Sequence, residues 1–144
     1  MAVISNADFH LRLEEALLAA KLGFEALMAS PPVLLKDAWP SMTNGVYAFS
    51  VGSEIVYVGE ATGLRGLRDR ICSKHVSGDD GHALQAAFSL DYPDRKARRE
   101  FLKNTISVQW VEIPDSLLVS LVEKLAISVL CPRFNKSVFR RNFK

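Results

Sequence analysis

The sequence predicts an α+β domain, in which a small three-stranded mixed sheet is flanked by helices and one extra helix precedes it. Three observations lead to this class: helical apolar spacing near the start, a strand–turn–strand pattern in the middle, and a long apolar helix pattern near the end. A chain of 144 residues fits one domain with one core. We divide it into a helical extension over 1–43, a core over 44–137 and a basic tail over 138–144.

The first helix is expected from Asp8 to about Ala29. Its apolar residues recur at intervals of three and four: Leu13, Leu17, Ala20, Phe24 and Leu27. Asp8 is a suitable N-cap, and Pro31 ends the helix because proline cannot continue it. Residues 33–44 then predict a connecting loop, since they hold several turn-forming residues.

The middle of the chain predicts a β-hairpin. Side chains alternate from Val46 to Val51, and Gly52-Ser53 supplies a tight turn. The segment from Glu54 to Val58 has the β-branched and aromatic residues that strands favour. Ile106 to Ile113 alternates again, which predicts the third strand.

Four more helices are expected after the hairpin, over 67–75, 82–90, 91–104 and 116–130. Pro114-Asp115-Ser116 marks the start of the last one, which ends before Cys131-Pro132. Its predicted core stripe consists of Leu118, Leu121, Val122, Leu125 and Val129.

Charge and cysteine usage restrict the class of protein only loosely. The net charge is +2, so the total does not indicate nucleic-acid binding, but basic residues cluster over 65–74, 95–103 and 133–144. These clusters predict either a phosphate-binding face or ordinary solvated helix faces. Cys72 and Cys131 lie in separate apolar segments, which fits a reducing, cytoplasmic setting. No apolar run is long enough to span a membrane.

Two tyrosines and one glutamate stand out as candidates for chemistry. Tyr47 begins the first hairpin strand and Tyr57 lies near the end of the second, so the hairpin brings them together. Tyrosine can orient or deprotonate a water molecule, although strand tyrosines commonly just pack in a core. Glu123 has apolar and small helical neighbours, so it needs a partner. A divalent cation and a basic side chain are the two candidates.

Several basic side chains and one asparagine complete the set of candidate site residues. Arg68, Arg70 and Lys74 follow the hairpin on one predicted helix, and His75 is next to them. Arginine binds phosphate through paired hydrogen bonds, whereas surface charge is the alternative reading. Asn135 follows the last helix. Phosphodiester hydrolysis needs a metal, a cation for the transition state and a group that activates water, and these residues supply all three.

In this order the residues resemble the GIY-YIG nuclease family. Gly45-Val46-Tyr47 resembles its first signature, and Ile55 to Ala61, which contains Tyr57-Val58-Gly59, resembles the second. Leu121 to Ile127 is similar to the family's metal-binding helix. Cys131 to Asn135 resembles its closing proline–x–aromatic–asparagine segment. The resemblance covers roughly 44–137.

The resemblance implies a role for each residue. Tyr47 and Tyr57 would flank the attacking water, Glu123 would hold one Mg²⁺ or Mn²⁺ ion, and Asn135 would order the site. The phosphate clamp is either Arg70 or Arg68, because the segment after Gly59 is longer than in excision-repair members. The family's histidine position is occupied by Lys74, with His75 one residue later. The residues expected to contact DNA are Lys74, Arg65, Arg133, Lys136, Arg140 and Arg141.

We therefore expect a divalent-metal-dependent DNA endonuclease without an organic cofactor. The long segment from Gly59 to Arg70 resembles restriction enzymes of the family, which favours a restriction-type enzyme and a possible homodimer formed through the N-terminal helix or the basic tail. A structure-specific repair or recombination nuclease is the alternative. An inactive DNA- or protein-binding module is the third hypothesis.

Overall fold

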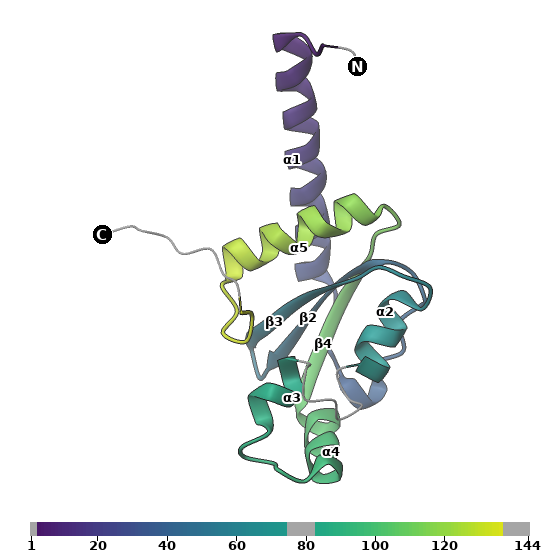
Figure 1. The fold of residues 1–144 in the computed structure, drawn as a ribbon, viewed down its shortest axis with the longest axis vertical. Helices are drawn as coiled ribbons and strands as arrows, with labels where there is room; N and C mark the ends of the chain where they lie inside the picture. Colours follow the sequence, from purple (N-terminus) through teal and green to yellow (C-terminus); the bar gives the residue numbers. More distant parts are fainter. Residues whose placement is uncertain (1–2, 75–82, 137–144) are drawn as a thin grey trace, which may run out of the picture.

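A four-stranded sheet forms the centre of the protein, and the computed structural model describes residues 3–74 and 83–136 (Figure 1). The strands are β1 (Val33–Leu34), β2 (Gly45–Val51), β3 (Glu54–Ala61) and β4 (Ile106–Glu112). Their order across the sheet is β1-β4-β2-β3, and every neighbouring pair is antiparallel. The strand β3 therefore lies at one edge.

The predicted α+β class is confirmed, but the predicted three-stranded mixed sheet is wrong in two details. The additional strand β1 comes from residues 33–44, which were expected to be a loop, and it pairs with β4 through Val33 and Val108. A strand of two residues is too short to show alternation. The direction of β4 was misjudged because the alternation of side chains carries no information about which way a strand runs.

The predicted hairpin of β2 and β3 is confirmed. Gly52 has a φ of +60°, and a two-residue turn at Gly52 and Ser53 joins the strands. The register shifts between Phe49 and Ser50. On the side of this bulge away from the turn, Phe49 pairs with Tyr57 and Tyr47 pairs with Gly59.

Helices cover both faces of the sheet. Their bounds are α1 (Asn6–Ala29), η1 (Leu35–Asp37), α2 (Gly66–Asp69), η2 (Arg70–Lys74), α3 (Ala83–Phe88), α4 (Arg95–Thr105) and α5 (Ser116–Leu130). One core cluster lies between the sheet and α1 with α5, and it includes Leu27, Val58 and Val122. The other includes Tyr47 and Leu102 and lies under the helices that connect β3 to β4. In Figure 1, α1 extends well beyond α5 at its N-terminal end.

Side chains at helix starts set the helix boundaries. Ser5 caps α1 by accepting a hydrogen bond from the backbone N–H of Asp8, so the expected capping role of Asp8 is wrong. Asp94 caps α4 through the N–H of Ala97. Asp115 caps α5, as the sequence predicts. None of the described helices is long and apolar enough to cross a membrane.

The buried face of α5 differs from the predicted stripe. The residues of α5 that are buried are Val119, Val122, Glu123, Ala126 and Ile127. Leu121 and Val129, expected in the core, are exposed. Apolar residues occur nearly all round this helix, so periodicity alone did not determine which face packs on the sheet. The consequence is that Glu123 points toward the protein interior and two large aliphatic residues point to solvent.

Candidate active site

The two tyrosines of the hairpin lie on the same face of the sheet and interact with each other. Their ring centroids are 6.3 Å apart, and a hydrogen bond joins their hydroxyl groups. Tyr57 also stacks on Phe49 at a centroid distance of 6.0 Å. Tyr47 is only 1% exposed, whereas Tyr57 is half-buried. The fully buried phenol is therefore held by packing, and Tyr57 is the one that solvent reaches.

Two glycines make room for this arrangement. Gly59 lies opposite Tyr47 in the sheet, and a Cβ added at Gly59 would overlap the hydroxyl and ring of Tyr47. A Cβ at Gly45 would overlap the carbonyl oxygen of Val111 and the side chain of Leu67. Where neighbouring atoms approach the Cα this closely, only glycine fits, even when its φ angle is one that other residues adopt. Gly59 is thus required by its contact with Tyr47, and Gly45 by its contacts with Val111 and Leu67.

Glu123 is on α5, and its side chain lies close to the two tyrosines near the edge of the sheet. Its residue exposure is 7%, and its charge raises the pKa of both Tyr47 and Tyr57. A carboxylate this deeply buried requires a partner. The Nζ of Lys124 lies 2.6 Å from its Oε1. A carboxylate has lone pairs on both oxygens, so this ion pair is compatible with a cation on the second oxygen.

Lys124 and Glu60 are members of the site that the sequence did not reveal. The hydrogen bond with Glu123 is the main reason why the pKa of Lys124 is raised, and the charge of Glu60 adds to it. Glu60 also accepts a hydrogen bond of 2.9 Å from the Ser120 hydroxyl. Successive helical residues do not face each other, so spacing offered no signal for the pairing of Lys124 with Glu123. The lysine makes it through its long, flexible side chain.

The structure separates the two candidate arginines. Arg70, at the start of η2, is close enough to lower the pKa of Tyr47 and of Tyr57. Arg68 points elsewhere, because its Nε donates to the carbonyl of Pro40 at 2.9 Å and its guanidinium lies 4.4 Å from the ring centroid of Trp39. Arg70 is thus the arginine that shares a site with the tyrosines and Glu123.

Asn135 anchors the edge strand that carries Tyr57. Its Oδ1 accepts from the backbone N–H of Val58, and its Nδ2 donates to the Val58 carbonyl, both at 2.9 Å. The N–H of Phe134 donates to the carbonyl of Val56 at 2.9 Å. The segment after α5 thus pairs with the outer edge of β3 much as another strand would. Asn135 holds the backbone next to Tyr57.

Burial dominates the electrostatics of the tyrosines. Desolvation raises the pKa of Tyr47 well above its ordinary value, and the hydrogen bond with Tyr57 raises it further. Desolvation likewise raises the pKa of Tyr57, but the hydrogen bond with Tyr47 lowers it. When Tyr57 is deprotonated, the Tyr47 hydroxyl is the donor of this hydrogen bond and the Tyr57 oxygen accepts it. Both phenols are protonated at neutral pH, and the phenolate of Tyr57 is the better stabilised of the two.

The predicted DNA-contacting residues are dispersed. Arg65 and Arg70 line a hollow of about 350 Å³ beside the site. Arg133 forms an ion pair of 3.0 Å with Glu54 and lies over the Phe134 ring, and Lys136 is exposed after Asn135. The residues for which the structure describes no side chain are Lys74, His75, Arg140 and Arg141.

Comparison of the chain with protein families, with curated proteins and with solved structures finds no match. The interpretation of this site therefore depends on its residues and their geometry.

The donor set suits one hard divalent cation bound mainly by non-protein oxygens. Within residues 3–74 and 83–136, no group of three or more His, Cys, Asp or Glu side chains gathers. Mg²⁺ is commonly held by one or two carboxylates, with water and phosphate oxygens completing its octahedron. Glu123 fits that pattern, since it is a buried carboxylate beside two phenols and a guanidinium. The same set does not suit Zn²⁺, which prefers several Cys or His ligands.

Proposed function

We propose that this chain is a divalent-metal-dependent endonuclease of the GIY-YIG type that hydrolyses phosphodiester bonds in DNA. The observation that carries the proposal is the convergence of Tyr47, Tyr57, Arg70 and Glu123 from four different elements. A core packed only for stability has no need of a buried carboxylate beside two phenols. In phosphodiester hydrolysis such groups can hold a metal and activate water.

Each side chain has a distinct task in this proposal. Arg70 binds the scissile phosphate through its guanidinium and offsets the charge that develops on it. Glu123 holds the cation, and a bound Mg²⁺ would stabilise charge on the phosphate and on the leaving oxygen. Lys124 balances part of the Glu123 charge through the 2.6 Å ion pair.

Tyr57 is the residue that we assign to the attacking water. It is the more accessible of the two phenols, and the hydrogen bond that it accepts from Tyr47 stabilises its phenolate. Tyr47 acts as the buried donor that orients Tyr57. This division of roles makes Tyr57 the group that orients water and accepts its proton, and makes Tyr47 a positioning residue.

DNA is the proposed substrate because basic side chains line two exposed hollows, and the one that contains Arg70 lies beside the site. Arg65 and Arg70 line one hollow, and Arg95, Lys96 and Arg99 on α4 line another of about 500 Å³. Such residues bind phosphates irrespective of sequence. Cys72 and Cys131 lie in separate segments of the chain, which fits the proposed cytoplasmic location. A restriction-type enzyme that acts as a homodimer remains our preferred subclass.

The proposal is tested with purified protein and supercoiled plasmid DNA, with Mg²⁺ or with a chelator. We expect cleavage only with the metal, and we expect Glu123→Gln to lower the rate by about 10³-fold, since metal stabilisation is worth several kcal/mol. Glu15→Gln, on the solvent side of α1, is the matched control and should cleave like wild type. Discrete fragments indicate a restriction-type enzyme, whereas cleavage confined to branched substrates indicates a repair or recombination nuclease.

The absence of metal-dependent cleavage on duplex, single-stranded and branched DNA would refute the enzyme proposal. If the protein then still bound DNA with a strong salt dependence, it would be a binding module. Equal rates for wild type and Glu123→Gln would show that the activity does not come from this site.

A further inference from the structure

The N-terminal half of α1 exposes an unusual number of large apolar side chains. Those with 45% or more of their surface exposed are Phe9, Leu11, Leu13 and Leu17, and Phe9, Leu13 and Leu17 share one side of the helix because they are four residues apart. The residues of α1 that are buried, Ala20 and Leu27, lie in its second half, where it packs on α5 and the sheet. Figure 1 shows the first half extending away from the rest of the fold. Phe9, Leu13 and Leu17 thus form an exposed apolar stripe, and such a stripe marks an interaction site.

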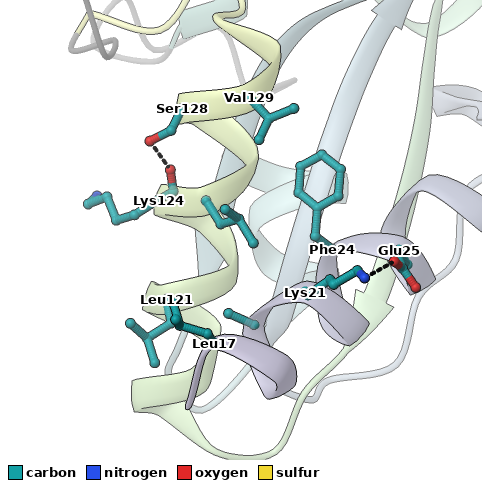
Figure 2. A pocket seen from close by; sticks show the side chains of 10 residues that line it. Leu17, Lys21, Phe24, Glu25, Leu121, Lys124, Ser128 and Val129 are labelled. Carbon is teal, nitrogen blue, oxygen red and sulfur yellow. Dashed lines mark hydrogen bonds and ion pairs between the residues drawn. The ribbon is translucent and has the colours of Figure 1, made fainter. Parts of the chain in front are cut away.

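An apolar groove lies beside the packed half of the same helix. It has a volume of about 630 Å³ and is formed between α1 and α5. Its walls are Leu17, Ala20 and Phe24 on α1, together with Leu121, Leu125 and Val129 on α5. Figure 2 shows Leu17 and Phe24 on one side facing Leu121 and Val129 on the other. The two helices cross steeply (Figure 1), so the groove is open along the side of α1 that carries Leu17 and Phe24, where another helix can lie.

We infer that the occupant of this groove is the α1 helix of a second copy of this chain, in a two-fold symmetric dimer. In such a contact the projecting half of each α1 lies along the packed half of the other and against α5 of the partner subunit. One surface then covers both the stripe of Phe9, Leu13 and Leu17 and the groove. This inference concerns the partner of the chain and does not depend on its being a nuclease.

The charges on α1 complement each other in this arrangement. Glu14 and Lys21 are seven residues apart, so both lie on the side of the helix that also carries Leu17. When two α1 helices run antiparallel about an axis between Leu17 and Leu18, Glu14 faces Lys21 of the partner subunit. His10 then faces Glu25 of the partner subunit. The Lys21–Glu25 contact within one helix is long, at 3.8 Å, and both side chains are largely exposed, so it does not prevent these pairs.

The size of the contact is adequate for a stable dimer. A helix of 24 residues is about 36 Å long and about 10 Å across, so one side of α1 offers on the order of 400 Å². The exposed side of α5 adds to this area along the groove. One side of α5, which has 15 residues, adds about 200 Å² at most, so the sum of about 600 Å² per subunit lies at the lower end of specific interfaces.

The test is sedimentation equilibrium of the full chain over a range of concentrations, without DNA or metal. We expect the wild type to be a dimer and Leu17→Glu to be a monomer, since it places four carboxylates at the centre of the contact together with Glu14 of each copy. Leu90→Glu is the matched control, because Leu90 is 94% exposed and lies outside the groove. It should dimerise like wild type. Circular dichroism checks that all variants are folded.

A charge swap tests the pairing itself. Glu14→Lys and Lys21→Glu should each weaken the dimer by about tenfold or more, and the double variant should restore most of the affinity. A wild type that stays monomeric at its highest soluble concentration overturns the inference. So does a dimer that Leu17→Glu leaves intact. Because no cleavage is measured, these outcomes are independent of the proposed nuclease activity.

Discussion

The two sides of α5 differ in opposite ways from the usual pattern, in which apolar side chains are buried and charged side chains are exposed. Its inner side buries the carboxylate of Glu123 next to two phenols, and its outer side exposes Leu121 and Val129 along an apolar groove. Buried charges and exposed apolar patches are the informative exceptions in a folded protein. The first indicates chemistry that needs a desolvated charge, and the second indicates a missing partner. One helix thus joins the proposed reaction site to the proposed dimer contact.

The largest expected effect beyond that of Glu123 concerns the inner side. Tyr57→Phe should lower the cleavage rate by about 10²-fold, because it removes the group that acts on water. Tyr47→Phe removes only the donor to Tyr57 and should cost about tenfold. Single-turnover cleavage of a defined duplex measures both. Equal losses for the two variants would contradict the division of roles between them.

The pH dependence of the cleavage rate is a second, independent test of the different roles of Tyr57 and Tyr47. Because burial raises the pKa of Tyr57, its deprotonation becomes easier only as the pH rises toward and beyond the usual value of 10.0. The wild-type rate should therefore increase with pH across the neutral and mildly alkaline range, and Tyr57→Phe should flatten the profile. A wild-type plateau below about pH 8 would exclude Tyr57 as the proton acceptor.

An intermediate effect is expected at the edge of the sheet. Asn135→Ala removes two hydrogen bonds to Val58 and should lower the free energy of unfolding by about 2 kcal/mol. Urea denaturation measures the loss. Asn135→Asp keeps the acceptor for the Val58 N–H and loses the donor to its carbonyl, so it should fall between wild type and Asn135→Ala. An unchanged stability in Asn135→Ala would mean that the end of the chain does not anchor β3.

The smallest effect is expected at Lys124. Lys124→Ala removes the cation that pairs with Glu123, so less positive charge competes with Mg²⁺. The Mg²⁺ concentration for half-maximal cleavage should fall by about two- to fivefold, because much of the lysine is exposed and its charge is screened. Lys36→Ala, an exposed lysine on η1, is the control and should leave this concentration unchanged. A higher Mg²⁺ requirement in Lys124→Ala would indicate that the lysine supports the cation site.

Local patterns in the sequence predicted the parts of the site that depend on near neighbours. The hairpin was predictable because its turn and its alternation are local, and the hairpin alone brings Tyr47 near Tyr57. Glu123 was singled out because its neighbours one helical turn away are apolar or small, although the predicted core stripe of α5 did not include it. The predicted end segment also lies at the site, where Asn135 binds the backbone of β3.

Contacts between distant segments decided the rest. The choice of Arg70 over Arg68 depends on Pro40 and Trp39, which are about thirty residues upstream and engage Arg68. The rotation of α5, its groove with α1 and the pairing of β1 with β4 likewise follow from packing between elements. The sequence by itself determined which residues are available for chemistry, because residue type and local periodicity are written along the chain. Only the tertiary structure decided which of them meet, since burial depends on what the rest of the chain places against each face.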